Sequence, residues 1–266
     1  MPYAVEEFFP RFADATLAAE HAHNPLRAFS RIDASPSASV RGETCWEGGV
    51  ALANFLACST TTAGECAGKR VLEIGAGCAG YPGRTLALAG AAYVLLTDAN
   101  EDALEQLRGG LRVVASGDDV VADYSDKTLP VHDARMMNAY GLGDPARNVA
   151  PRLEVTTLDI NVPPPTFGER VRNDVDAFDI ILAADVLYNE DEQTCTGLFR
   201  TAALCLAPGG RLIIAYAHRA DDAFLSPIAT GEYGFRAVAI HAVKRDVMAQ
   251  GWNTELEIVE FARVAQ

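Results

Sequence analysis

The stretch EIGAGCAGYPG, residues Glu73 to Gly83, joins the end of an apolar run to a turn rich in glycine. Gly75, Gly77 and Gly80 satisfy the pattern G-x-G-x-x-G, in which the backbone turns sharply and a ligand approaches without a Cβ in the way. The pattern alone leaves the ligand open. A dinucleotide, a nucleoside triphosphate and a less charged compound all remain candidates.

Strand and helix patterns alternate on both sides of this turn. Apolar runs typical of strands occupy 70–77, 92–100, 153–160, 178–188 and 211–219, and helical spacing marks 85–90, 101–114 and 191–206. This alternation predicts a parallel sheet, and two last strands at 235–243 and 256–264, with no helix between them, predict an antiparallel hairpin at one edge. We therefore expect an α/β, Rossmann-like, doubly wound and mostly parallel seven-stranded sheet with an antiparallel edge hairpin.

Composition and residue patterns divide the chain into a short N-terminal segment and one larger domain. Residues 1–44 form an N-terminal lead-in with one short helix over Glu6–Ala19, and residues 45–266 form one domain whose first helix begins near Glu47. The polar segment 115–148 is long for a connection in such a unit, so we interpret it as an insertion.

Charge and cysteine usage limit the partners and the location. With 22 Lys and Arg against 36 Asp and Glu, the net charge is −14, and the scattered basic residues predict no direct binding of nucleic acid. The six cysteines form no Cys-x-x-Cys pair, so no metal site is indicated. The sequence has no recognisable secretory leader and no apolar run near 18 residues. We expect a monomer that does not bind membranes, in the cytosol and possibly also the nucleus, with reduced thiols.

Two acidic residues narrow the choice of ligand. A P-loop is excluded because no Gly-Lys-Ser/Thr follows the glycines. Asp98 ends the second strand, at the position where a carboxylate binds a ribose in dinucleotide-binding folds. A nicotinamide dinucleotide therefore remains a candidate ligand. Glu73 lies just ahead of the first glycine, and a carboxylate there would repel a pyrophosphate and favour a cationic nucleoside.

The residues Glu73 to Gly77, followed by Asp98 at the next strand end, resemble the first motif of seven-strand S-adenosylmethionine-dependent methyltransferases. In that family the glycine turn lies against the methionine portion of the cofactor, and the later carboxylate accepts both ribose hydroxyls. The resemblance covers roughly residues 45–264. It implies S-adenosyl-L-methionine as the cofactor.

A second resemblance concerns the protein-lysine methyltransferase branch of these enzymes, of the methyltransferase-like 21 type. It rests on FDIILAADVLY at 178–188, with Asp185 and Tyr188, on Trp46 ahead of a helix, and on GYPGRTLALAGA after the first glycines. The resemblance implies Asp185 and Tyr188 as catalytic residues. The cofactor residues it implies, with Glu73 added from its position, are Trp46, Glu73, Gly75, Ala76, Gly77, Asp98, Asp159, Ile160, Ala183 and Tyr188.

These residues also have purely structural explanations. Trp46 could belong to the core, Tyr188 could cap its strand, and Asp185 could cap the following helix. Ile160 stands where relatives often carry tryptophan, so the adenine would lose an aromatic contact.

The predicted activity is methylation of a protein lysine, with Asp185 and Tyr188 orienting the amine. A small-molecule N-methyltransferase with a nicotinamide- or amine-type acceptor is the main alternative. A nicotinamide-dependent oxidoreductase would need a second acid-base group, such as a Tyr-x-x-x-Lys motif after a strand, and this sequence shows none. A non-enzymatic scaffold would have no use for the intact acidic residues and glycines.

Overall fold

A computed structural model describes residues 3–22, 25–31, 42–59, 65–116, 152–162, 177–187, 192–217, 227–243 and 256–264. Its centre is a seven-stranded sheet, with strand order β5-β4-β3-β6-β7-β9-β8. The strands are β3 (Arg70–Ile74), β4 (Tyr93–Asp98), β5 (Arg152–Thr157), β6 (Phe178–Ala184), β7 (Leu206–Ala217), β8 (Phe235–Ala242) and β9 (Leu256–Arg263). The predicted fold class is confirmed.

Five strands are parallel and two are antiparallel. β5, β4, β3, β6 and β7 pair in parallel, and β9 pairs antiparallel to both β7 and β8. The hairpin therefore lies at an edge as predicted, but the last strand of the chain occupies the inner position. β7 begins at Leu206, the last residue of the predicted helix 191–206, and so starts earlier than the strand predicted from residue 211. Its pairing with β6 shifts register between Phe178 and Ile180.

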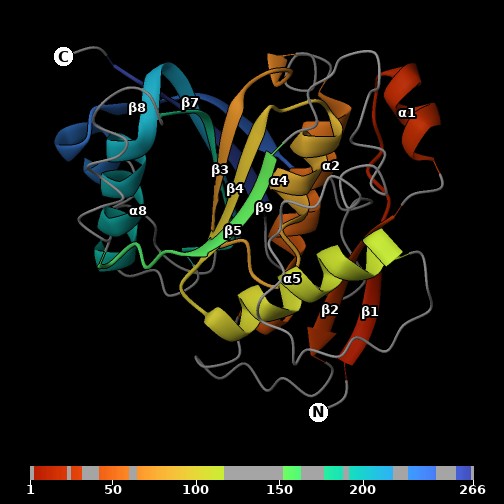
Figure 1. Ribbon diagram of the computed structural model, residues 1–266. Helices are drawn as coiled ribbons and strands as arrows, with labels where there is room; N and C mark the ends of the chain where they lie inside the picture. The colour runs from red at the N-terminus through yellow and green to blue at the C-terminus, as the bar shows by residue number, and fades with distance from the viewer. Residues whose placement is uncertain are drawn as a thin grey trace.

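Helices cover both faces of the sheet (Figure 1). α2 (Glu47–Cys58), α4 (Tyr81–Leu88) and α5 (Glu101–Ser116) lie on one face, and α8 (Glu192–Cys205) lies on the other with the short π-helix η2 (Ile228–Glu232). The alternation of side chains along β3 explains this arrangement: Leu72 and Ile74 pack in the α8 layer, whereas Val71 packs in the layer of α2 and α4.

The N-terminal region is more ordered than the sequence predicted. β1 (Tyr3–Phe8) and β2 (Leu26–Arg31) form a separate antiparallel sheet, with α1 (Ala15–His21) between them in the chain. The predicted helix over Glu6–Ala19 is therefore wrong over its first half. β2 packs against α5, at the lower right of Figure 1, and Asp14 caps α1 by accepting hydrogen bonds from two backbone N–H groups.

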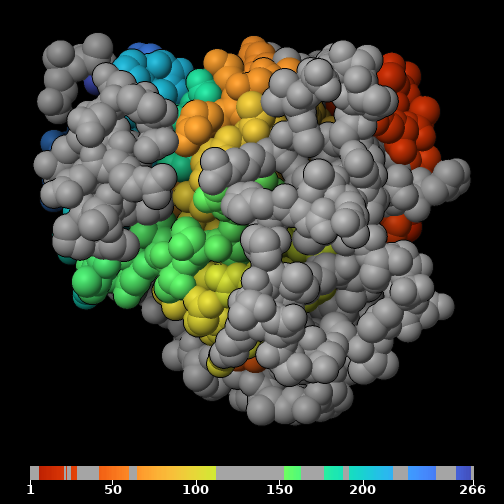
Figure 2. Space-filling view, in the orientation of Figure 1, coloured from red at the N-terminus to blue at the C-terminus, as the bar shows by residue number. Residues whose placement is uncertain are grey.

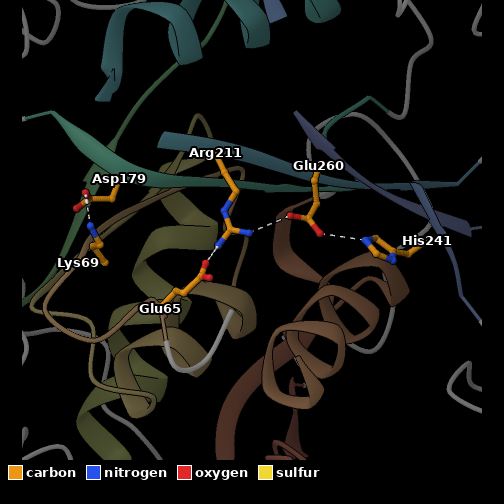
Figure 3. Close-up of polar contacts among 6 residues, drawn as sticks. All are labelled: Glu65, Lys69, Asp179, Arg211, His241 and Glu260. Carbon is orange, nitrogen blue, oxygen red and sulfur yellow. Dashed lines mark hydrogen bonds and ion pairs between the residues drawn. The ribbon is translucent and has the colours of Figure 1, made fainter. Parts of the chain in front are cut away.

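A row of charged side chains ties the antiparallel edge to the rest of the sheet (Figure 3). Arg211 of β7 donates to Glu65 at 2.6 Å and to Glu260 of β9 at 3.3 Å. The other oxygen of Glu260 lies 3.0 Å from Nε2 of His241 on β8. Because Glu260 is 8 % exposed, these two partners compensate for the water that its carboxylate loses.

Most of the predicted insertion 115–148 lies outside the described residues, which resume at the start of β5. β5 and α5 lie side by side on the face shown in Figure 2, in green and yellow. None of the helices within the described ranges is both long and apolar enough to cross a membrane.

Candidate active site

A cavity of about 360 Å³ opens at the carboxyl ends of the parallel strands, around the point where the strand order reverses. This volume suits a small ligand. The loops that follow β3, β4, β5 and β6 all contribute to the wall, together with the segment before α2 and the start of α8. The lining residues are Gly42, Trp46, Ile74, Gly75, Gly77, Asp98, Ala99, Asn100, Leu158, Asp159, Ile160, Asn161, Ala184, Asp185, Val186 and Thr194.

The glycine turn after β3 forms one wall as predicted. Gly75, Gly77 and Gly80 have φ angles of +71°, +56° and +54°, a region that side-chain-bearing residues rarely adopt. A Cβ at Gly75 would lie 2.6 Å from Cγ2 of Val186. Glycine is therefore required at Gly75 by both the backbone conformation and the space that Val186 fills.

Asp98 connects the end of β4 to this turn. Its carboxylate accepts hydrogen bonds from the backbone N–H of Gly77 at 2.9 Å and of Asn100 at 2.8 Å. Burial raises the pKa of Asp98, and the backbone N–H donors oppose that rise. An ionised carboxylate offers about four lone-pair positions, so acceptor positions remain toward the cavity.

The loop after β5 supplies an apolar patch with a polar rim. Leu158 and Ile160 are 3 % and 8 % exposed and line the cavity. Asp159 points to solvent at the rim and accepts a hydrogen bond from the backbone N–H of Asn161 at 2.8 Å. This patch suits a flat apolar group, although it offers no aromatic ring for stacking.

Asp185 lies at the far side of the glycine turn, directly after β6. Its carboxylate accepts a 2.7 Å hydrogen bond from the backbone N–H of Gly48, in the first turn of α2. Asp185 has a φ of +53°, which Asp and Asn tolerate better than other side-chain-bearing residues. The predicted capping role is therefore present, but it serves α2 and not the following helix.

The segment before α2 covers the glycine turn. The carbonyl of Gly42 accepts a 2.8 Å hydrogen bond from the backbone N–H of Cys78, and Glu43, which is 5 % exposed, accepts one from Gln106 of α5. Trp46 is half-buried, lines the cavity and occupies the N-cap position of α2 in an extended conformation. Trp46 thus lies at the site where the resemblance placed it.

Glu73 lies elsewhere than we expected. Its carboxylate does not line the cavity but is fully buried in the layer of α4, where it accepts a 2.7 Å hydrogen bond from the backbone N–H of Gly83. Burial raises the pKa of Glu73 to about 8. The argument that an ionised Glu73 attracts a cationic ligand is therefore wrong: strand alternation turns this side chain away from the cavity.

Two alanines of the predicted site also stay out of the lining. Ala183 is fully buried in the α8 layer, and the neighbouring Ala184 lines the cavity in its place. The side chain of Ala76 packs in the core, while its backbone N–H donates to the carbonyl of Thr97 and so fixes the turn. Tyr188 lies outside the described residues, and its predicted role stays a prediction.

Several lining residues were missed from the sequence. Asn100 and Val186 lie within the last three residues of predicted strands, and Asn161 directly follows one, so position at a strand end could have signalled all three. Gly42 and Thr194 carry no such signal, because tertiary packing brings them to the cavity from a turn-rich segment and from α8.

Comparisons with known proteins agree with this geometry. Residues 31–125 match the model of a family described as lysine methyltransferase. The magnesium protoporphyrin IX methyltransferase of Synechocystis, solved with bound S-adenosylmethionine, superimposes with a TM-score of 0.51 at 15 % identity, over 87 % of this chain and 86 % of that one. The search of curated proteins found no significant match.

A second solved structure, described as a methyltransferase in complex with S-adenosylhomocysteine, superimposes with a TM-score of 0.53 at 12 % identity. The match covers 89 % of this chain and 53 % of that one. At these identities the structures establish the fold. Together with the family match and the geometry of the cavity, the fold defines the protein as an S-adenosylmethionine-dependent methyltransferase, with S-adenosylmethionine as its cofactor.

The residues present fit this cofactor. Gly75 and Gly77 of the glycine turn line the cavity, where the methionine portion would lie against their backbone. Asp98 keeps acceptor positions for ribose hydroxyls, and Leu158 with Ile160 offers apolar contact to the adenine. Among the lining residues that the structure describes there are three aspartates and no lysine, arginine or histidine, which suits a ligand with a sulfonium and an ammonium group.

Proposed function

We propose that this protein transfers a methyl group from S-adenosylmethionine to the side-chain amine of a lysine in a protein substrate. The observation that carries the proposal is the position of Asp185, whose carboxylate lines the cavity and is held against the first turn of α2. The description of the matched family as lysine methyltransferase supports the same acceptor.

In this proposal, the chain mainly aligns the reactants and excludes water. Gly75, Gly77 and Asp98 hold the cofactor, and Trp46 covers it beside α2. Bound there, S-adenosylmethionine supplies an electrophilic methyl group, which the amine nitrogen takes with its lone pair while the sulfur keeps the electrons of the broken bond.

Asp185 acts on the acceptor. A lysine amine arrives as a cation, and the carboxylate orients it at the end of the cavity. The ammonium group then loses a proton to solvent, because nitrogen has no free lone pair before that loss. We also propose, from the sequence prediction, that Tyr188 orients the same amine.

The acidic surface of the protein favours a basic segment as substrate. The net charge of −14 attracts cationic partners and works against nucleic acid. We therefore propose that a monomer acts on basic protein segments in the cytosol or the nucleus. The proposal does not depend on the methyltransferase-like 21 branch in particular.

A methyl-transfer screen tests the acceptor. The protein is incubated with S-adenosylmethionine carrying a labelled methyl group, together with a protein extract and separately with a pool of small metabolites. We expect label in polypeptide, recovered as methyl-lysine after hydrolysis and identified by mass spectrometry. The variant Gly75→Ala serves as the inactive control. Label that enters only small amines would contradict the protein acceptor and support a small-molecule N-methyltransferase.

A further inference from the structure

One face of α8 packs directly on the loop that follows β5. Residues 158–161 of this loop all line the cavity, and so does Thr194 in the first turn of α8. Three residues further along the helix, a Cβ at Gly197 would lie 2.8 Å from the carbonyl oxygen of Ile160. The helix therefore approaches the backbone of the loop so closely that only glycine fits between them.

Arg200 follows Gly197 on the same face of α8 and holds the loop by its backbone. Its Nη2 donates hydrogen bonds to the carbonyl of Ile160 at 2.8 Å and to the carbonyl of Asn161 at 3.2 Å. Hydrogen bonds from a charged donor are stronger than those between neutral groups. Arg200 thus fixes two successive residues of the cavity wall, although its own side chain is outside the lining.

The contact with Ile160 orients Asp159 through a single peptide unit. In a planar trans peptide, the C=O of one residue and the N–H of the next point in opposite directions, and no cis peptide bond occurs in the described ranges. The C=O of Ile160 points to Arg200, and the N–H of Asn161 donates to Oδ1 of Asp159 at 2.8 Å. Arg200 and Asp159 therefore bind opposite sides of the same peptide unit.

Asp159 is the polar group beside the apolar patch that would contact the adenine. It lines the cavity, and its hydrogen bond with Asn161 occupies only one of the about four lone-pair positions of an ionised carboxylate. Adenine carries an amino donor at position 6 of the purine, whereas hypoxanthine carries an oxygen there. A carboxylate held at this place accepts from adenine and repels the oxygen of hypoxanthine. Because Ile160 offers no aromatic stacking, this polar contact matters more.

We propose that Arg200 is a positioning residue for the adenine of the cofactor. By holding the peptide unit between Ile160 and Asn161, it orients Asp159 to accept the 6-amino group. Gly197 serves the same end, since it lets α8 approach the loop. The inference concerns the cofactor end of the cavity, so it does not depend on which methyl acceptor the protein uses.

Calorimetry with two ligands that differ only at position 6 of the purine tests this role. S-adenosylhomocysteine carries the amino group, and S-inosylhomocysteine carries an oxygen. The Kd of each is measured for the wild type, for Arg200→Met and for Arg263→Met. Arg263 is a matched control, because it also donates to a backbone carbonyl at α8, that of Ala203 at 2.7 Å, but contacts neither the loop nor the cavity.

We expect the wild type and Arg263→Met to bind S-adenosylhomocysteine more tightly than S-inosylhomocysteine. In Arg200→Met this preference should fall on the order of tenfold, because the peptide unit that holds the carboxylate loses its charged donor. Arg200→Lys keeps a charged donor and should retain more of the preference than Arg200→Met. A merely structural role would weaken the binding of both ligands by the same factor and leave their ratio unchanged.

Asp159→Ala shows whether Arg200 acts through Asp159. Alone, this change should lower the preference at least as much as Arg200→Met does. Combining the two changes should add no further loss, because both remove the same contact to the 6-amino group. Additive losses would mean that Arg200 acts on the adenine by another route and would contradict the inference.

Gly197→Ala disturbs the same contact without removing the arginine. Its Cβ would press on the carbonyl of Ile160, so we expect the preference for S-adenosylhomocysteine to fall. Gly231→Ala is the control, since a Cβ at Gly231 meets no atom within 4 Å, and it should keep the wild-type preference. Should Arg200→Met not fold, Gly197→Ala decides: the wild-type preference in that variant contradicts the inference.

The remaining outcomes separate this inference from the assignment of the cofactor. If Arg200→Met keeps the wild-type preference, or if the wild type binds both ligands equally, the inference is wrong and S-adenosylmethionine remains the cofactor. If the wild type binds neither ligand, the cofactor assignment fails and the inference fails with it.

Discussion

The carboxylate of Asp185 accepts a 2.7 Å hydrogen bond from the backbone N–H of Gly48. This contact joins the end of β6 to the start of α2, two segments far apart in the sequence, at the wall of the cavity. It fixes the orientation of the carboxylate before any ligand binds. Residues held in this way need no reorganisation when the reactants arrive.

Replacing Asp185 by asparagine should separate turnover from cofactor binding. Asparagine tolerates the φ of +53° and keeps an oxygen for the N–H of Gly48, but it removes the charge. We expect the rate of methyl transfer to protein to fall by at least about tenfold, because a charged contact to the amine is lost. The Kd of S-adenosylhomocysteine from calorimetry should stay close to that of the wild type. Equal losses of rate and of binding would place Asp185 on the cofactor instead.

Two alanine variants separate backbone strain from blockage of the cavity. Gly75→Ala and Gly209→Ala both place a side chain at a positive φ, +71° and +78°, and each should lose about 1–2 kcal/mol of the free energy of unfolding. A Cβ at Gly209 meets no atom within 4 Å, whereas a Cβ at Gly75 meets Val186 beside the cavity. We expect only Gly75→Ala to lose binding of S-adenosylhomocysteine in calorimetry. Comparable affinities for the two variants would show that the turn does not hold the cofactor.

Asp98 should matter for the cofactor more than for folding. In Asp98→Asn the ionised acceptor for the ribose is lost, so the Kd of S-adenosylmethionine should rise about 10- to 100-fold. Asp179 offers a matched control, because it also accepts a backbone N–H, from Arg70 at 2.9 Å, but lies outside the cavity lining. Asp179→Asn should bind the cofactor as the wild type does. If both variants lose binding to the same degree, the effect of Asp98 comes from folding.

Glu73 should make the stability of the protein depend on pH. Its folded pKa of about 8 lies above the ordinary value of 4.5, so between these values the folded state holds a proton that the unfolded state has lost. The stability that this group contributes is complete below pH 4.5 and falls as the pH rises toward 8, by up to about 1.4 kcal/mol per pH unit.

Glu73→Gln tests this dependence. Glutamine keeps an oxygen for the N–H of Gly83 and cannot ionise. In urea unfolding, we expect the variant to gain stability relative to the wild type between about pH 5 and pH 8. Glu192→Gln, at an exposed position, should show no such trend. A difference between Glu73→Gln and the wild type that is independent of pH would contradict a buried, protonated Glu73.

Local patterns explain which parts of the fold could be predicted. β3 and β6, the strands beside the glycine turn, are continuous apolar runs, as is typical of strands that are buried on both faces. Such runs can be read directly from the sequence. β1 and β2 were missed because they are short, carry charged residues such as Glu6 and Glu7, and are paired across an intervening helix. Their pairing is a contact between distant segments, and no local pattern signals it.

The sequence by itself determined the order of the strands and helices of the seven-stranded sheet, the glycine turn and the strand ends that carry Asp98 and Asp185, because these depend on backbone conformation and on residue type at fixed spacing. Only the tertiary structure decided which side chains face the cavity. One step along a strand reverses the face of the sheet, which buries Glu73 and Ala183 and exposes Ala184. It also decided that Gly48 meets Asp185, because that contact requires packing of α2 against the end of β6.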